Sequence, residues 1–403
     1  MIDLPGGEVL EGQQPYEALY IHIPFCKSKC AYCDFASEAI SADDLRIEAY
    51  IDELILSIRA ASRADLLGDL KTVYIGGGTP THIGNKQLSR LLYALSLSMH
   101  LTPEVECTLE VNPESLTEAM VKDLFALGVT RLSFGVQSFD DAVLATLGRA
   151  HDAEQARKAI ERAQLRFENI SLDLMCGIPG QSIDSFRSSV EEALSLGVTH
   201  VSIYPLTIEE GTRLRDLMDR SAFVESEDAL SDAAAEMMVC AEELLVAHGF
   251  HRYEVASYAR AGFECEHNKM YWTGKPYLGV GHAAVSMKQN DASRVRFSDG
   301  CVQEVRTHEQ ALVEDLMLGM RMSRGVSAEK VRAVEALVPN TRSAFVSLEE
   351  KGLVLERAGR FVPSEKGWLY GNEIFAALLD LAGMRISSIV RGRFQPPLRI
   401  TYR

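Results

Sequence analysis

The chain has 403 residues, of which 47% are hydrophobic, and a formal net charge of −16. This length suits two or three domains with buried cores, and the acidic balance argues against a nucleic-acid partner, since such binding rests on clustered cations. No apolar run approaches the roughly 18 residues of a transmembrane segment, and no secretory signal pattern opens the chain, so any membrane contact is expected to be peripheral.

Strands and helices are predicted to alternate in the first half of the chain. Residues 1–15 are rich in Gly, Pro and Gln and are predicted as an N-terminal lead-in. Apolar, β-branched runs then predict strands, and apolar residues at helical spacing predict helices between them. The strands are expected at 20–23, 72–75, 106–111, 131–135, 170–175 and 200–204, and the helices at 43–60, 87–98, 118–127, 153–163 and 185–196. This alternation implies parallel βαβ units.

Polar residues on one face of successive strands favour a barrel over an open sheet. Glu110 shares a strand face with Thr108, and Asp173 shares one with Ser171, whereas the residues between them are apolar. A polar face would be costly in a fully packed barrel but suits a lumen that holds a polar ligand. We therefore expect an α/β fold with a partial (β/α)6, TIM-like barrel over residues 16–215, open laterally, with its chemistry at the C-terminal ends of the strands.

The pattern changes after residue 215. Residues 216–303 are predicted as an extension of the barrel, with a long helix at 226–248, a strand-like run at 253–256 and a Gly-rich stretch. Residues 304–385 are predicted as a winged-helix-like, α-rich C-terminal domain, and 386–403 as a basic tail. Because the chain is acidic and lacks a basic recognition helix, this domain is expected to close the barrel or dock a partner rather than bind DNA.

Three of the eight cysteines, Cys26, Cys30 and Cys33, follow the first strand with C-x3-C-x2-C spacing. Thiolates this close in sequence can surround one soft metal centre. A structural zinc site would need a fourth ligand, such as His22, Asp34 or a distant cysteine, whereas a reactive centre keeps one position open. The spacing alone leaves both open. The other five cysteines are scattered singly, which is typical of a reducing, cytoplasmic compartment.

Further candidate residues stand where the predicted strands end. The run Gly76-Gly77-Gly78 follows the second strand, and consecutive glycines let a backbone approach a ligand closely, although a plain tight turn is an equal interpretation. Glu110 and Asp173 are carboxylates in apolar strands, where such groups need a partner, for example a ligand ammonium or ribose. Gln137 and Arg149 complete the set, and Arg149 could bind a carboxylate through two donors. The alternative for each is an ion pair that closes the barrel.

Four motifs, taken together and in order, resemble the radical S-adenosylmethionine (SAM) superfamily and, within it, the oxygen-independent coproporphyrinogen III oxidase group. They begin at Tyr20 (YIHIPFC), Gly76 (GGGTPT), Ser133 (SFGVQSF) and Asp173 (DLMCGIPG). The resemblance implies a [4Fe-4S] cluster with SAM on its fourth iron and the other three irons on Cys26, Cys30 and Cys33. It also implies SAM contacts at Tyr20, Gly77, Gly78, Thr79, Glu110, Gln137, Arg149 and Asp173.

Two markers separate the branches of this group. The oxidase branch carries a further cysteine two positions after the third ligand, where this chain has Phe35, and a longer arm before the cluster. The HemW-type heme-chaperone branch reads C-x3-C-x2-C-x-F and carries H-N-x-x-Y-W, present here from His267 to Trp272. The resemblance therefore implies a chaperone that binds heme and passes it to acceptor hemoproteins, respiratory ones among the candidates. Oxidative decarboxylation of coproporphyrinogen III is the alternative activity, and an active oxidase of this kind is not expected.

The resemblance also implies heme contact by His267. A histidine beside aromatic rings can ligate heme iron while the rings stack on the macrocycle. From the residues alone, a satisfied core histidine is the alternative. A Gly-Ala-His-like run is usual after this motif in the chaperone branch, but here the histidine is displaced to His282, to which no role is assigned.

Overall fold

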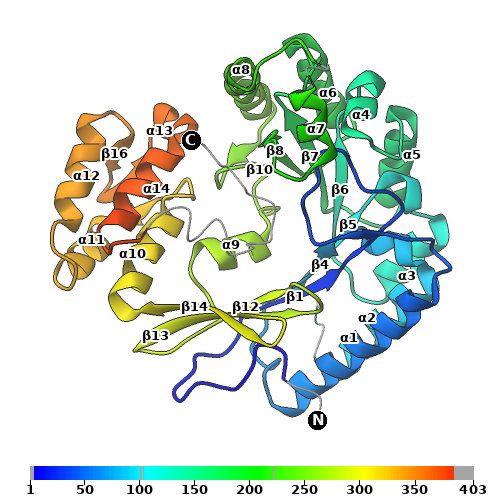
Figure 1. Cartoon of the computed structure of the whole chain (residues 1–403), viewed down its shortest axis with the longest axis horizontal. Coiled ribbons are helices and arrows are strands. Elements are labelled where there is room, and N and C mark those ends of the chain that lie inside the picture. Colours follow the sequence, from blue (N-terminus) through cyan, green and yellow to red (C-terminus); the bar gives the residue numbers. More distant parts are fainter. Residues whose placement is uncertain (1–3, 100–101, 103, 221–222, 385–403) are drawn as a thin grey trace.

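The computed structural model describes residues 4–99, 102, 104–220 and 223–384. Six parallel strands form its centre in the order β1-β4-β5-β6-β7-β8 (Figure 1). Their bounds are Ala18–Ile23, Thr72–Gly77, Glu106–Val111, Arg131–Gln137, Ile170–Cys176 and His200–Pro205. The predicted parallel βαβ units and the partial barrel are thereby confirmed.

Helices cover the outside of this arc of strands. They are α1 (Leu45–Arg63), α2 (Asn85–Ser98), α3 (Glu118–Ala126), α4 (Asp141–Leu147), α5 (Ala153–Gln164) and α6 (Ile183–Ser195). Local sequence sets where they begin: Asp44 caps α1 by accepting the Arg46 N–H, and Asp152 forms a capping box with Gln155 at α5. The apolar strand residues pack against these helices in one large core, so the polar face of each strand is left to the lumen.

Short elements frame the C-terminal ends of the strands. Strands β2 (Phe25–Cys26) and β3 (Glu38–Ala39) pair in parallel around the cysteine loop. Two 3-10 helices, η1 (Pro80–Ile83) and η2 (Pro113–Ser115), follow β4 and β5. Each begins at a proline, whose missing N–H is not needed in a first turn.

The segment after β8 extends the sheet on both sides. It contains α7 (Arg213–Asp219), the long α8 (Glu227–Ala247), β9 (His251–Arg252), β10 (Ser257–Ala259), α9 (Glu266–Trp272), β11 (Tyr277–Val280), β12 (Val285–Gln289), β13 (Ser293–Ser298) and β14 (Cys301–Thr307). The strand predicted at 253–256 is wrong: these residues lie between β9 and β10, and Glu254 makes an isolated bridge to Met322. The Gly-rich stretch predicted from the sequence covers β11 and the start of β12, and Gly279 lies within β11, where a glycine weakens the strand pattern. Strands β13 and β14 are not among the predicted strands.

The C-terminal part has the order of a winged helix. Its elements are α10 (His308–Gly319), β15 (Val326–Ser327), α11 (Ala328–Glu335), α12 (Thr341–Glu350), β16 (Val354–Arg357), β17 (Arg360–Pro363), α13 (Glu365–Leu369) and α14 (Gly371–Asp380). Strands β15, β17 and β16 form a small antiparallel sheet, the expected wing. The predicted domain boundaries stay predictions, and the basic tail predicted at 386–403 lies outside the described residues.

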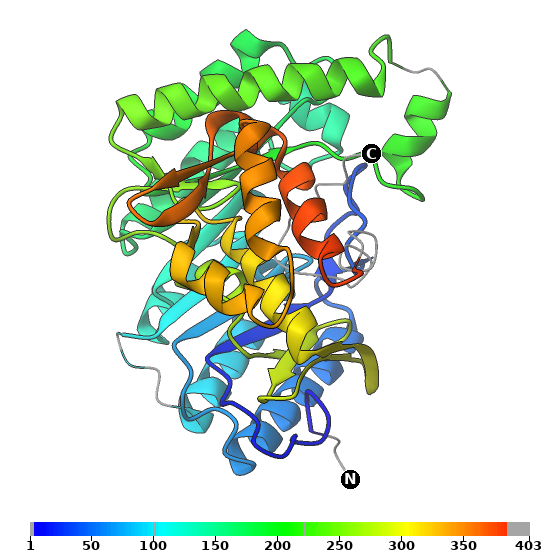
Figure 2. The ribbon, with the colours of Figure 1, turned by 90° about the vertical axis from the view of Figure 1, so that its left-hand side faces the viewer.

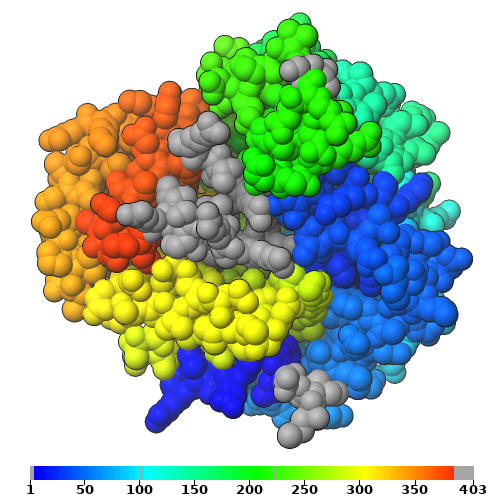
Figure 3. All heavy atoms as spheres, viewed as in Figure 1, coloured from blue at the N-terminus to red at the C-terminus, as the bar shows by residue number. Residues whose placement is uncertain are grey.

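The C-terminal helices stand beside the barrel and share a core with it. Figure 2 shows α11 to α14, in orange and red, in front of the barrel, with α8 crossing above them. In Figure 3 the same helices lie on the side opposite the blue and cyan barrel helices. The second core joins residues of this part, such as Phe375, to Ala18, Tyr271 and Tyr277 of the barrel side.

Helix α9 lies inside the arc of strands, between the barrel and the C-terminal helices (Figure 1). Its first turn contacts Thr72 and Glu106, the first residues of β4 and β5, so it closes the end of the lumen at which the parallel strands begin. We call this end the floor and the end at which the strands finish the mouth. Within the described residues, no helix combines the length and the apolar character that a membrane span needs.

Candidate functional site

The cysteine loop lies across the mouth and is anchored by its backbone. Ala31 is buried, its N–H donates to the Leu147 carbonyl at 2.9 Å, and its own carbonyl accepts the Leu214 N–H at 2.7 Å. These bonds tie the loop to the ends of two helices. The cysteines on either side of Ala31 are thereby held over the strand ends.

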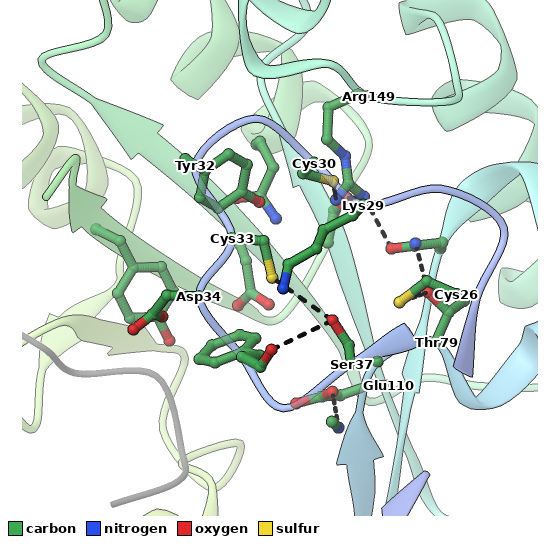
Figure 4. A pocket seen from close by; sticks show the side chains of 18 of the residues that line it. Cys26, Lys29, Cys30, Tyr32, Cys33, Asp34, Ser37, Thr79, Glu110 and Arg149 are labelled. Carbon is green, nitrogen blue, oxygen red and sulfur yellow. Dashed lines mark hydrogen bonds between the residues drawn. The ribbon is translucent and has the colours of Figure 1, made fainter. Parts of the chain in front are cut away.

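All three cysteines line one cavity of about 350 Å³ (Figure 4). The cavity also receives Gly77, Gly78, Thr79, Glu110, Gln137, Arg149 and Asp173, so ten of the predicted site residues line one space. Each sulfur has a different neighbour. Thr79 Oγ1 lies 3.6 Å from Cys26 Sγ, Arg149 Nη1 lies 3.4 Å from Cys30 Sγ, and Ser37 Oγ lies 4.0 Å from Cys33 Sγ.

Burial disfavours the thiolate form of two of these cysteines. It raises the pKa of Cys26 and raises that of Cys33 to about 11. A metal or cluster that takes up their thiolates must therefore displace protons. Beside the third cysteine, the Arg149 guanidinium donates to Cys30 Sγ at 3.4 Å.

The alternative zinc ligands are placed differently. His22 is fully buried outside the cavity lining, with Nδ1 3.0 Å from Tyr20 Oη and Nε2 2.9 Å from the Ala36 carbonyl oxygen. Asp34 lines the cavity. In the part of the chain that the structure describes, no three His, Cys, Asp or Glu side chains converge as one metal ion would need. An iron–sulfur cluster does not require the thiolates to converge on one point, because each cysteine binds a different iron.

The glycine run is explained by what surrounds it. A Cβ on Gly76 would lie 2.7 Å from the Glu110 carboxyl carbon, and one on Gly78 would lie 2.8 Å from the Phe25 carbonyl oxygen. Gly77 has a φ of +118°, and a Cβ there would lie 2.5 Å from the His22 ring. The absence of side chains in this run thus lets the Glu110 carboxylate, the His22 ring and the start of the cysteine loop pack directly against its backbone.

Two carboxylates from the barrel strands β5 and β7, Glu110 and Asp173, face the cavity. Glu110 accepts the Gly77 N–H and the Tyr74 hydroxyl, each at 2.9 Å. Burial raises the pKa of Glu110. Burial and, next, the charge of Glu110 raise the pKa of Asp173 to about 7. A cation entering the cavity would stabilise both charged forms, which is the arrangement expected for a cationic ligand.

Arg149 reaches the cavity because Gly148, with a φ of +69°, ends α4 in a left-handed cap. Its Nη2 donates to the Gly135 carbonyl oxygen at 2.6 Å and to Asn112 Oδ1 at 2.8 Å. Its buried Nε has no hydrogen-bond partner within the described residues. Arg149 is therefore held by neutral oxygens, and among the described residues it makes no ion pair of the kind that the alternative predicted.

Sequence reasoning missed Asn112, which lines the cavity and joins two site residues. Its Oδ1 accepts from Arg149, and its Nδ2 donates to Thr79 Oγ1 at 2.9 Å. The signal was present in the alternation, since Asn112 continues the polar face of Thr108 and Glu110.

Gln137 ends β6 in an unusual conformation. Its φ is +70°, and the pairing register between β6 and β7 shifts between Gly135 and Gln137. A glutamine in the left-handed region carries backbone strain, and such strain gathers at binding sites. The bulge turns the Gln137 side chain into the cavity.

Tyr20 and His267 lie outside this cavity. The Tyr20 hydroxyl is directed at His22, so the structure does not bring it to the predicted SAM contact. The His267 ring is fully buried at the floor, with Nδ1 2.8 Å from Thr72 Oγ1 and Nε2 3.2 Å from Tyr271 Oη. Burial lowers the pKa of His267 to about 3. With both ring nitrogens bonded inside the protein, this geometry does not support the predicted heme contact and favours the core-histidine alternative.

Comparisons with known proteins agree with the fold. Residues 20–193 match the Radical SAM superfamily. The chain is 36% identical over 386 residues to heme chaperone HemW from Bacillus subtilis, covering 90% of this chain and 99% of the relative. It is 35% identical over 384 residues to heme chaperone HemW from Haemophilus influenzae, covering 91% and 98%.

Among solved structures, coproporphyrinogen III oxidase (HemN) from Escherichia coli has the same fold. It matches with a TM-score of 0.74 at 20% identity, over 90% of each chain. The two HemW relatives, which this chain covers almost from end to end, establish the family. The chain belongs to the HemW family within the radical SAM superfamily.

Proposed function

We propose that this chain binds heme and passes it to acceptor hemoproteins, and that it carries a SAM-ligated [4Fe-4S] cluster at the mouth of its barrel. The observation that carries the proposal is the 36% identity to heme chaperone HemW of Bacillus subtilis over 99% of that relative. Phe35 supports it, because an apolar ring lines the cavity at the position where the oxidase branch has a further cysteine.

Cys26, Cys30 and Cys33 would hold the cluster. When bound, the cluster supplies one-electron chemistry and an iron with an open coordination position. Arg149 would hold negative charge on the Cys30 sulfur through its hydrogen bond of 3.4 Å. The backbone bonds of Ala31 would keep the loop over the strand ends, so that the cysteines need no rearrangement of the barrel.

The remaining cavity residues would receive SAM. Glu110 and Asp173 offer carboxylates to an ammonium and to ribose hydroxyls, and the absence of side chains at Gly77 and Gly78 lets the ligand approach the backbone. The strained Gln137 and the buried Arg149 place further polar groups around the same space. These contacts bind and orient the ligand and keep water away from it.

Heme transfer tests the proposed function. Reconstituted protein is loaded with heme, mixed with an acceptor apo-hemoprotein of the respiratory chain and separated from it by size. We expect heme to appear in the acceptor faster than from free heme, with the chain left heme-free. Failure of the purified protein to retain heme through gel filtration would contradict the proposal.

The fold gives one rival function. The likeness to coproporphyrinogen III oxidase favours oxidative decarboxylation of coproporphyrinogen III as a second candidate. Anaerobic, reconstituted protein is incubated with SAM, a reductant and coproporphyrinogen III. We expect no formation of protoporphyrinogen IX. Multiple turnovers would show that the chain is an oxidase and would contradict the proposed chaperone function.

Metal content distinguishes the cluster from zinc. Protein purified without oxygen is analysed for iron, acid-labile sulfide and zinc. We expect iron and sulfide in equal amounts, about four of each per chain for a [4Fe-4S] cluster. Stoichiometric zinc without sulfide would rule the cluster out.

A further inference from the structure

Helix α9, which carries the H-N-x-x-Y-W residues, is fixed at the floor by a single carboxylate. Glu106 of β5 accepts the backbone N–H of Glu266 at 2.9 Å and of His267 at 3.0 Å, and the Cys265 Sγ lies 3.4 Å from it. These bonds satisfy backbone donors of the first turn, which no helix can pair internally. The histidine at the second position of the helix is thereby set at a fixed height in the lumen.

His267 packs on β4 through two residues of the same strand face. Its Nδ1 lies 2.8 Å from Thr72 Oγ1, and its ring centroid lies 5.0 Å from that of Tyr74. Thr72 and Tyr74 are two positions apart, so both point into the lumen. His267 therefore touches the inner face of β4 at two successive inward positions.

The inner face of β4 then leads from the floor to the mouth. The Tyr74 hydroxyl donates to Glu110 Oε1 at 2.9 Å, and Glu110 packs against Gly76, the next inward residue of β4. The other oxygen of Glu110 accepts the Gly77 N–H. The carboxylate that lines the cavity is thus held by the strand that His267 supports.

The last turn of α9 belongs to the second core. Tyr271 packs edge-on to Tyr277 with ring centroids 4.6 Å apart, and the Arg321 guanidinium lies 5.1 Å from the Trp272 ring centroid. Both ends of the helix are thus held, the first turn by Glu106 and the last turn by these packing contacts. His267 has no room to withdraw from Tyr74 without disturbing that core.

We propose that His267 is a positioning residue for the SAM site: its ring fixes Tyr74, and Tyr74 orients the Glu110 carboxylate toward the cavity. This role rests on the proposed binding of SAM at the mouth. It gives the histidine of the H-N-x-x-Y-W motif a function that needs no contact with heme. His267 would act through Tyr74, without touching the ligand itself.

The test measures SAM affinity, heme retention and iron content in the cluster-loaded protein. The variants are His267→Ala, which removes the ring, and Tyr74→Phe, which keeps the ring and removes the hydroxyl. Tyr258→Phe is the matched control, because this tyrosine is equally buried and its hydroxyl contacts Arg252, away from Glu110. The double variant His267→Ala with Tyr74→Phe completes a cycle that measures coupling.

We expect each single variant to raise the SAM Kd about tenfold, the cost of losing one hydrogen bond to a charged acceptor. The double variant should raise the SAM Kd no further, because both changes act through the same bond. The Tyr258→Phe control should stay within about twofold, as expected for a distant site. Iron content and heme retention should equal those of the unchanged protein in all four.

Other results would overturn the role. If His267→Ala is folded and loses heme while its SAM Kd is unchanged, His267 is a heme ligand instead. If His267→Ala does not fold, Tyr74→Phe decides, and an unchanged SAM Kd in that variant excludes the path to Glu110. If the unchanged protein holds a cluster but binds no SAM, the proposed cofactor site fails as well, which is distinguishable because heme retention is measured separately.

Discussion

The mouth and the floor of the barrel contain similar side chains in opposite states. At the mouth, Glu110 and Asp173 face a cavity of about 350 Å³, and the buried Nε of Arg149 has no partner within the described residues. At the floor, Glu106 and His267 are equally polar, but α9 fills the space and their polar atoms are hydrogen-bonded inside the protein. Binding is expected at the first end and stability at the second.

This contrast shows why residue type alone is a poor guide to function. In the sequence, His267, which is near two aromatic residues, and Cys33, which follows Tyr32, both resemble ligand sites. The first is closed by Thr72 and Tyr271, whereas the second opens on a cavity. Free space next to unused hydrogen-bonding capacity separates the two cases.

The largest expected effect follows from removing a cluster cysteine at the mouth. Cys33→Ala leaves two thiolates, and we expect complete loss of iron and sulfide, because a cluster bound through SAM has no protein ligand to spare. Iron and sulfide analysis after anaerobic reconstitution measures this. Cys301→Ala is the control, since Cys301 is exposed and far along the chain on β14. Full cluster content in Cys33→Ala would remove this residue from the ligand set.

Glu110→Gln removes a buried charge and keeps the shape of the side chain. We expect the SAM Kd to rise about 30-fold or more, the cost of losing one member of a buried, hydrogen-bonded charge pair. Equilibrium titration of cluster-loaded protein with SAM gives the value. The exposed Glu118→Gln on α3 serves as control. Equal affinities in the two variants would place the ammonium elsewhere.

The raised pKa of Asp173 predicts that SAM affinity and protein stability depend on pH. Its pKa of about 7 lies above that of an unfolded aspartate, so the folded protein binds the extra proton between about pH 4 and pH 7 and loses stability as pH rises through that window. Ionised Asp173 attracts a cationic ligand, so SAM affinity should increase about tenfold or less from about pH 6 to about pH 8. Asp173→Asn should abolish this increase and raise the melting temperature of the ligand-free protein above about pH 7. A SAM affinity with the same pH profile in both proteins would exclude Asp173.

Glu106→Gln tests the floor. The amide keeps one acceptor oxygen where the carboxylate used two for α9, so the free energy of unfolding should fall by about 1–3 kcal/mol. Denaturant unfolding measures the change, and iron content should be unaltered. Loss of the cluster without loss of stability would contradict the assignment of stability to the floor and of cofactor binding to the mouth.

Local signals allowed most of the barrel to be predicted from the sequence. The strand 106–111 has the predicted bounds, and the helix predicted at 226–248 is observed as Glu227–Ala247 between its caps Ser226 and His248. Both depend on periodicity and capping within a few residues. The polar strand faces also predicted the lumen, which receives Glu110 and Asp173.

The features that escaped prediction depend on contacts far apart in the chain. Gly279 of β11 is required by close packing against the Val285 backbone, since a Cβ there would lie 2.4 Å from the Val285 carbonyl oxygen. The burial of His267 depends on Thr72, which lies 195 positions away. The positive φ of Gln137 follows from a register shift between two strands. No local pattern reports such pairings, because they arise when the barrel closes.

The most direct test of the account is the response of the reduced cluster to SAM. Anaerobically reconstituted protein is reduced, and its electron paramagnetic resonance spectrum is recorded with and without SAM. We expect a cluster signal that SAM shifts in the unchanged protein, with Glu110→Gln requiring about 30-fold more SAM for the same shift. A cluster signal that SAM leaves unaltered would contradict the assignment of the mouth as the SAM site.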